Sequence, residues 1–293
     1  MQILAELEAY LSQADVREVY VNGNLGLGVL GPSHHELLPL PEFFRDKEAF
    51  ILACQNFALH QGLRLDPLRP FAGGILNKKS WRWHCIIPPA APQGPIFTLR
   101  KHLFGDLTID DFDGDKAHIM KIKSLMKQGA SLLFCGETGS GKTSLLTACL
   151  QTVALMERVL IVEELEEIPL LGGLWSRLLC KPLNVHGAGE LSMESLFREC
   201  LRLRPDRMVM GELRGKDFFC FLEAVSSGQK GVLASYHART PEQLNQRLLN
   251  SSFRPSSLGS LNVHGVFLQR NNPCRVTAVE KLPNLISAEK IDG

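Results

Sequence analysis

The chain has 293 residues, of which 45% are hydrophobic and 22% are charged. This composition is typical of globular proteins, and the length suggests two domains. Lysine and arginine together number 32 against 31 aspartates and glutamates, so the formal net charge is +1. That balance gives no support to a basic nucleic-acid-binding protein or to an acidic disordered tail.

The eight cysteines form no C-x-x-C pair and no short-spaced cluster with histidine. Most lie in apolar runs, which is typical of buried thiols in a reducing compartment. The N-terminus carries an early acid, Glu6, and lacks an apolar signal-peptide core, and no run of eighteen apolar residues occurs. We therefore expect neither a signal peptide nor a spanning helix, so any membrane association would use a partner protein or a surface contact.

Residues 1–103 are expected to form a small mixed α+β domain. Leucines at helical spacing predict a helix at the N-terminus, and a longer helix is predicted over residues 45–60. Apolar residues that alternate with polar ones predict strands at residues 17–21, 81–87 and 96–100. Residues 104–115 are rich in aspartate and are interpreted as an acidic linker.

Residues 116–293 show a different pattern, in which strands and helices alternate. The predicted strands are residues 132–135, 159–163, 207–210 and 232–235, and the predicted helices are residues 142–153, 193–203, 217–226 and 241–249. Two further strands are predicted near residues 263–269 and 275–280. This alternation predicts an α/β fold, a wound and mostly parallel sheet with helices on its faces.

A phosphate-binding pattern, G-x-x-x-x-G-K-[ST], lies between the first strand and the first helix of this second domain. Its glycines let the backbone wrap so that N–H groups point at phosphates, and the helix that follows adds its positive N-terminal end. Lys142 is expected to reach the β- and γ-phosphates, and Thr143 to ligate Mg²⁺. The sequence therefore predicts a P-loop that binds ATP or ADP with Mg²⁺. Its predicted nucleotide-binding residues are Gly136, Glu137, Thr138, Gly139, Ser140, Gly141, Lys142, Thr143 and Ser144.

Acidic residues follow two of the buried strands, where ligands bind in wound sheets. Glu212 follows the strand at 207–210 and is the first candidate to position the attacking water. Glu163 or Glu164, at the end of the strand at 159–163, is expected near the magnesium. His237 follows the strand at 232–235, where its side chain could sense the γ-phosphate.

Together these blocks resemble the ATPases of bacterial type II and type IV secretion and of type IV and Tad pili, most of all the Tad and type IV secretion branch. Four family motifs occur in order: a Walker A loop at 136–143, an acidic "Asp box" at 162–168, a Walker B segment at 201–215 and a His box at 231–238. The Walker B segment is the most specific, because it has Gly-Glu followed by x-Arg. The likeness extends to residues 18–23 and 98–101. The cysteine-rich zinc module of type II members is absent from the sequence, which argues against that branch.

The resemblance implies a RecA-like core, ATP hydrolysis and a homohexameric ring. It implies a cytoplasmic protein at the inner face of the inner membrane, bound there through platform proteins of a secretion system or pilus, with no nucleic-acid partner. It also implies that Glu212, Glu164, His237 and Arg100 are catalytic, and that Glu164 joins Thr143 at the metal. Arg82 is a second arginine that could reach the phosphates from the N-terminal domain.

Three positions depart from the family pattern. Glu164 stands where aspartate is usual, Ser235 replaces threonine in the His box, and Gln229 occupies a place where histidine is common. The departures at Glu164 and Gln229 leave open a regulatory nucleotide-binding subunit with little hydrolysis. A further alternative is a RecA-like nucleic-acid motor, against which the near-zero net charge weighs.

Overall fold

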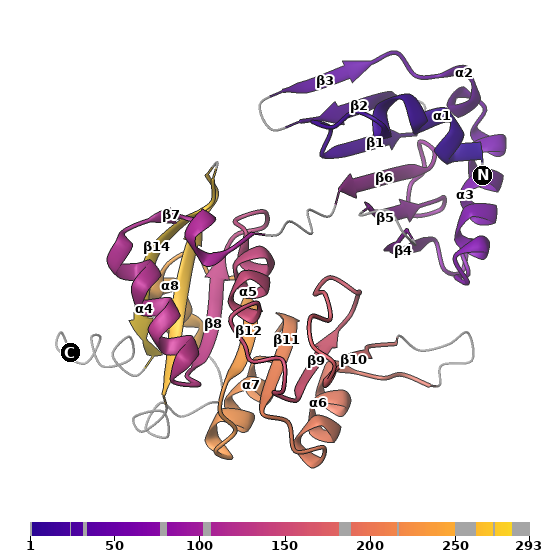
Figure 1. The fold of residues 1–293 in the computed structure, drawn as a ribbon. Helices are drawn as coiled ribbons and strands as arrows, with labels where there is room; N and C mark the ends of the chain where they lie inside the picture. Colours follow the sequence, from indigo (N-terminus) through magenta and orange to yellow (C-terminus); the bar gives the residue numbers. More distant parts are fainter. Residues whose placement is uncertain are drawn as a thin grey trace. The chain divides into compact units, whose positions relative to one another are not determined.

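A computed structural model describes residues 2–23, 25–31, 34–76, 81–101, 107–181, 189–215, 217–249, 262–271 and 273–282. The chain divides into two compact units, Met1–Leu103 and Phe104–Gly293 (Figure 1). Within the described ranges, no helix is long and apolar enough to cross a membrane.

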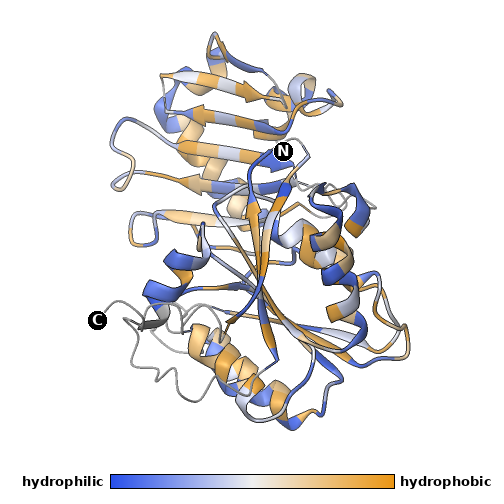
Figure 2. Ribbon diagram, turned by 90° about the vertical axis from the view of Figure 1, so that its left-hand side faces the viewer, coloured by the Kyte–Doolittle hydropathy of each residue, from blue (hydrophilic) through white to orange (hydrophobic). Residues whose placement is uncertain are grey.

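The first unit is a six-stranded antiparallel sheet with helices packed against it. Its strands, in the order β3-β2-β1-β6-β5-β4, are β1 (Glu18–Asn22), β2 (Gly26–Leu30), β3 (His35–Leu38), β4 (Phe71–Ile75), β5 (Trp81–Ile86) and β6 (Ile96–Lys101). The helices are α1 (Gln2–Leu11), α2 (Glu42–Arg45) and α3 (Lys47–His60). Buried residues alternate with exposed ones along β5, and Figure 2 shows such alternation of orange and blue in this sheet. The buried side chains of the sheet form one hydrophobic core with residues of α1, α2 and α3.

The second unit is built on an eight-stranded sheet in the order β10-β9-β11-β12-β8-β13-β14-β7. Its strands are β7 (Asp113–Gly114), β8 (Ser131–Gly136), β9 (Val159–Glu163), β10 (Trp175–Leu179), β11 (Arg207–Leu213), β12 (Val232–Tyr236), β13 (Val263–Gln269) and β14 (Arg275–Lys281). The strands from β10 to β13 pair in parallel, and β14 runs antiparallel to β13. The predicted α/β fold with a mostly parallel sheet is confirmed.

Helices cover both faces of this sheet. They are α4 (Lys116–Lys127), α5 (Lys142–Leu150), α6 (Met193–Arg202), α7 (Asp217–Ser226) and α8 (Pro241–Leu249), with a short 3-10 helix η1 (Ile109–Asp111) before β7. Successive residues of β8 face opposite cores: Leu132 and Phe134 pack with α4 and α5, whereas Leu133 and Cys135 pack with α6 and α7. Because β8 is buried on both faces, its sequence is a continuous apolar run.

The structure differs from the sequence-based expectations in a few places. Ile109 and Phe112, within the predicted linker, are buried in the core beside α4 and α5, so this part of the segment belongs to the second unit. Helix α4 and strand β10 were not predicted. Strand β11 continues through Gly211 and Glu212 to Leu213 instead of ending at residue 210.

Candidate active site

The loop between β8 and α5 has the tight curvature that a phosphate cradle requires. Gly139 and Gly141 have φ angles of 77° and 85°, in the left-handed region that favours glycine. A Cβ atom at Gly136 would lie 2.3 Å from Ser140 Oγ and 2.6 Å from the carbonyl oxygen of Leu268. The glycine spacing of the motif is therefore required by the fold of the loop itself.

The ammonium of Lys142 lies inside this curve. Its Nζ donates hydrogen bonds to the carbonyl oxygens of Gly136, at 3.1 Å, and Glu137, at 2.8 Å. Burial lowers the pKa of Lys142, against the opposing charges of Glu212 and Glu137. A buried ammonium beside a helix N-terminus attracts an anion, so the donors of this loop fit a polyphosphate.

The residues around the loop also fit a magnesium ion that is shared with phosphate. Thr143 is half-buried at the first turn of α5. Over the part of the chain that the structure describes, no group of three or more His, Cys, Asp or Glu side chains could by itself hold a metal. Mg²⁺ in nucleotide sites uses one or two protein ligands and completes its shell with phosphate oxygens and water. Thr143 with one carboxylate matches that chemistry.

Glu212 lies at an irregularity in the sheet. The pairing of β11 with β12 shifts register between Met210 and Leu213, the interval that contains Gly211 and Glu212. Such irregularities re-aim a side chain and are common beside active sites. A Cβ atom at Gly211 would lie 3.2 Å from Cγ of Glu163, so the glycine lets β11 pack closely against the end of β9.

Two neighbours hold the carboxylate of Glu212. His237 Nε2 lies 2.7 Å from Oε1, and Arg214 Nε donates to Oε2 at 2.9 Å. Burial acts to raise the pKa of Glu212, but the hydrogen bond and charge of Arg214, together with His237, outweigh it and lower the pKa. Glu212 is therefore ionised at neutral pH, which suits a carboxylate that orients water.

The two candidate acids at the end of β9 have different environments. Glu163 is 1% exposed and pairs with Arg177, whose Nε lies 3.0 Å from Oε2. Burial raises the pKa of Glu163 to about 7, although Arg177 and two backbone N–H groups act in the opposite direction. Glu164 is 52% exposed and pairs with Arg214, whose Nη1 lies 2.9 Å from Oε2. Of the two, Glu164 is the one whose side chain shares a partner with Glu212.

A further arginine lies beside the phosphate loop. Arg239, two residues after His237, has its Nη2 3.3 Å from Oε2 of Glu137, the second residue of the loop. Neither Arg239 nor Arg177 was predicted from the sequence. Arg239 could have been suspected from its position beyond a strand end, whereas the partner of Arg177 is set only by the pairing of β10 with β9.

The two candidate arginines of the first unit are cross-strand neighbours. Arg82 on β5 lies opposite Arg100 on β6, and Arg100 lies opposite Glu18 on β1. Residues directly opposite in an antiparallel sheet share one face, and like charges there are destabilising. Arginines held opposite one another offer a concentrated positive charge for a polyanion.

The sequence matches known proteins over most of its length. Residues 101–287 match the family described as "Type II/IV secretion system protein". VirB11, a type IV secretion system protein of Brucella suis, is 28% identical over 282 residues, which cover 84% of this chain and 75% of VirB11. A Mycobacterium tuberculosis protein whose name refers to conjugal transfer is 34% identical over 214 residues, which cover 70% of this chain and 61% of that protein's length.

Solved structures show the same fold. The ATPase DotB of Legionella pneumophila has a TM-score of 0.65 at 13% identity, with 98% of this chain and 86% of DotB covered. The pilus retraction motor PilT, solved with ADP, has a TM-score of 0.65 at 14% identity, with 99% and 87% covered. At such low identity these matches show similarity of fold alone, and they agree with the RecA-like core expected from the sequence.

Proposed function

Because the chain belongs to the type II/IV secretion system protein family, we propose that it is a P-loop ATPase whose hydrolysis of ATP powers protein secretion or pilus assembly. The observation that carries the proposal is one site in the second unit. There β12 lies between β8, which leads into the phosphate loop with buried Lys142, and β11, which carries Glu212. His237 and Arg239, which follow β12, contact Glu212 and the loop residue Glu137 respectively. A cation for the phosphates and an acceptor for water are the two elements that hydrolysis needs.

The residues act as follows in this proposal. Lys142 exchanges its two carbonyl partners for oxygens of the β- and γ-phosphates, and the loop N–H groups bind the rest. Thr143 and Glu164 hold Mg²⁺, which when bound neutralises charge on the phosphate oxygens. Glu212 accepts a hydrogen bond from the attacking water and orients it, while His237 fixes the position of Glu212.

In this proposal Arg100 and Arg82 of the first unit contribute positive charge to the phosphates, as the family resemblance implies. Arginine suits this role because its guanidinium stays charged and offers a planar pair of donors. The proposed assembly is a homohexamer that works on the cytoplasmic side of the inner membrane, bound to platform proteins of a secretion system or pilus. What supports these last points is the match to the type II/IV secretion system protein family and the similarity to VirB11, a type IV secretion system protein.

The test is steady-state ATPase activity measured together with native mass. Wild type is compared with Lys142→Ala, Glu212→Gln and a control, Lys127→Ala, which removes an exposed lysine at the end of α4. We expect a hexamer, loss of nucleotide binding in Lys142→Ala, and a fall in turnover of about 100-fold in Glu212→Gln with ATP binding retained. Lys127→Ala should match wild type.

The same assay decides between the alternatives. A wild-type protein that binds ATP but turns it over no faster than Glu212→Gln would be a regulatory subunit. Hydrolysis that requires added DNA or RNA would indicate a nucleic-acid motor. A monomer that neither binds nor hydrolyses ATP would contradict the proposal in every form.

A further inference from the structure

The carboxylate of Glu163, at the end of β9, is buried and fully engaged. Its Oε1 accepts hydrogen bonds from the backbone N–H groups of Glu167, at 3.0 Å, and Ile168, at 2.9 Å. Its Oε2 accepts from Arg177 Nε at 3.0 Å. The acidic segment that follows β9 therefore folds back over the side chain of Glu163.

Arg177 holds this segment at three points. Besides Glu163, its Nη1 donates to Glu166 at 2.9 Å, and its Nη2 donates to the carbonyl oxygen of Ile168. Arg177 lies on β10, which pairs in parallel with β9 (Figure 1), and its side chain is only 17% exposed. One guanidinium thus ties the edge strand of the sheet to both ends of the segment 163–168.

This arrangement restricts Glu164, which follows Glu163 directly. The backbone on one side of Glu164 is fixed because the carbonyl of Glu163 accepts from the N–H of Cys180 at 2.8 Å. On the other side, the N–H groups of Glu167 and Ile168 are fixed by the side chain of Glu163. The carboxylate of Glu164 is thereby held where Arg214 joins it to Glu212.

We propose that Arg177 is a positioning residue for the metal-side carboxylate: through buried Glu163 it holds the segment 163–168 in the conformation that presents Glu164 to Mg²⁺. This inference rests on the proposed function only for the assignment of Glu164. The side chain of Arg177 is mostly buried and its nitrogens donate to the segment 163–168, so its proposed effect on the metal is indirect. Its three donors satisfy acceptors on three different residues, which a planar guanidinium can do and an ammonium on one flexible stem does poorly.

The test compares wild type with Arg177→Gln, Arg177→Lys and Glu166→Gln. Arg198→Gln is the matched control, because it removes an arginine–glutamate pair from the surface of α6 in the same unit. Two quantities are measured at pH 8. The first is hydrogen exchange of the Glu167 and Ile168 amides without nucleotide. The second is the Mg²⁺ concentration that half-saturates binding of a fluorescent ATP analogue and, separately, ATP hydrolysis.

In Arg177→Gln, the two amides should exchange at least tenfold faster, and the half-saturating Mg²⁺ concentration should rise at least fivefold. Binding of the ATP analogue in EDTA should stay within twofold of wild type, because Lys142 and the loop are unchanged. Arg177→Lys should restore part of both effects, and Glu166→Gln should show a smaller change in the same direction. Arg198→Gln should show none.

Faster amide exchange in Arg177→Gln with an unchanged Mg²⁺ requirement would overturn the proposal and leave Arg177 a purely structural residue. If Arg177→Gln does not fold, Glu166→Gln and Arg177→Lys decide the question by the same two readouts. Failure of the proposed function would appear in a different measurement, the binding of nucleotide by the wild-type protein. A wild-type protein that binds no nucleotide at any Mg²⁺ concentration would remove the site itself.

Discussion

His237 Nε2 lies 2.7 Å from Oε1 of Glu212. This hydrogen bond joins the residue directly after β12 to the next-to-last residue of β11. Two further contacts support the pair. Ser235 Oγ donates to the carbonyl oxygen of Gly211 at 2.5 Å, and Arg247 donates from Nη1 to the carbonyl oxygen of His237. The serine that replaces the usual threonine thus keeps a hydroxyl at the place where β11 and β12 meet.

His237→Ala is predicted to reduce turnover more than nucleotide binding. If His237 orients Glu212, its loss should lower kcat about 10- to 150-fold, since a hydrogen bond to a charged group contributes about 1.5–3 kcal/mol. KM for ATP should change less than twofold. The measurement is the kcat and KM of His237→Ala beside His60→Ala, an exposed control in the first unit. An increase in KM of the same size, with kcat unchanged, would instead indicate that His237 contacts the phosphate in the ground state.

Arg214→Gln is predicted to tighten Mg²⁺ binding while it slows turnover. Arg214 pairs with both Glu164 and Glu212, so a metal that binds Glu164 must displace a guanidinium. Its removal should lower the half-saturating Mg²⁺ concentration several-fold, whereas kcat should fall because Glu212 loses one of its two partners. The Mg²⁺ dependence of hydrolysis measures both, with Arg202→Gln on the surface of α6 as the control. A higher Mg²⁺ requirement would mean that Arg214 aids the metal site.

The wound sheet of the second unit was predictable because its inner strands are buried on both faces and therefore read as continuous apolar runs. The same rule explains why the edges were missed. In β10 the polar residues Ser176 and Arg177 interrupt the run, since an edge strand is covered less completely. Helix α4 was missed for a different reason. Its apolar residues Ile119, Ile122 and Leu125 lie at helical spacing, but they follow an aspartate-rich segment that was interpreted as a linker.

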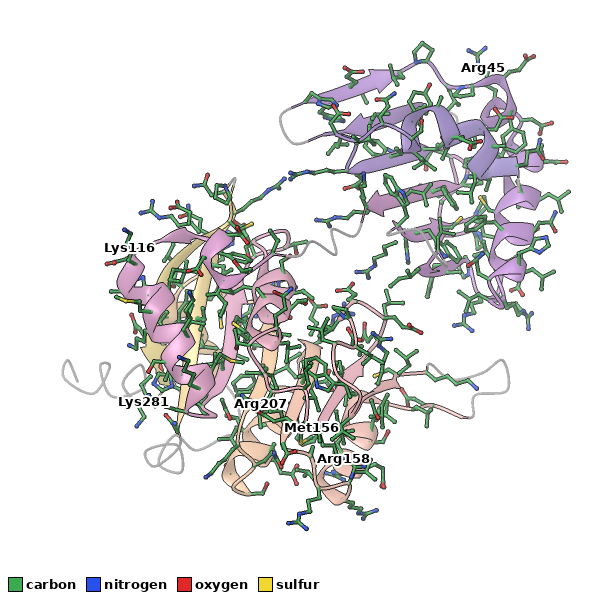
Figure 3. The ribbon with its side chains drawn as sticks, viewed as in Figure 1. Arg45, Lys116, Met156, Arg158, Arg207 and Lys281 are labelled. Atoms are coloured by element: carbon green, nitrogen blue, oxygen red, sulfur yellow. The ribbon has the colours of Figure 1, made fainter. Side chains whose placement is uncertain are left out.

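In the candidate site, the sequence indicated mainly the residues that follow the ends of buried strands. Glu212 and His237 were singled out because side chains after parallel strands meet at one edge of the sheet, and the structure joins them by a hydrogen bond, whereas their roles stay predictions. The residues alone left Glu163 and Glu164 open, and the family resemblance favoured Glu164, which stays a prediction. The different environments of the two side chains could not be read from the sequence, because they depend on Arg177 from another strand. Gln229 precedes β12 and donates to the carbonyl oxygen of Pro205 at 3.1 Å, at the strand-start edge of the sheet. Figure 3 labels Arg207, the first residue of β11, at that same edge. Replacing histidine there leaves the residues around Glu212 in this unit untouched.

Arg100→Gln and Arg82→Gln are predicted to impair hydrolysis without unfolding the first unit. The two residues lie opposite each other on β6 and β5, where like charges are destabilising, and Arg100 also lies opposite Glu18 on β1. Because Arg100→Gln removes both a repulsion and an attraction, its net effect on stability should be small. We expect kcat to fall at least tenfold in Arg100→Gln and less in Arg82→Gln, as in other enzymes that use arginine at a phosphate. ATPase assays and thermal unfolding measure the two effects, with Arg17→Gln as an exposed control. Wild-type turnover in both variants would exclude these arginines from the reaction.

The stability of the second unit is predicted to depend on pH through His264. This residue of β13 is 7% exposed, and its Nδ1 has no hydrogen-bond partner among the described residues. Burial lowers its pKa from 6.5 to about 4, with Lys121 and Lys281 acting in the same direction. Because the folded pKa lies below the unfolded one, the unfolded chain takes up a proton first as the pH falls. Above pH 6.5, protonation of His264 therefore costs the folded state nothing, and the free energy of unfolding is at its full value. That free energy decreases as the pH falls from 6.5 to about 4.

A shift of that size corresponds to about 3 kcal/mol across this interval. His264→Gln cannot be protonated, so its free energy of unfolding should fall less steeply between pH 7.5 and 4 than that of wild type, by about 3 kcal/mol in total. Urea unfolding at several pH values measures the free energy of unfolding of both proteins. The contributions of other groups that titrate in both proteins cancel when one curve is subtracted from the other. His60→Gln, an exposed histidine, should follow the wild-type curve. Parallel curves for wild type and His264→Gln would show that His264 is protonated equally in the folded and unfolded chain.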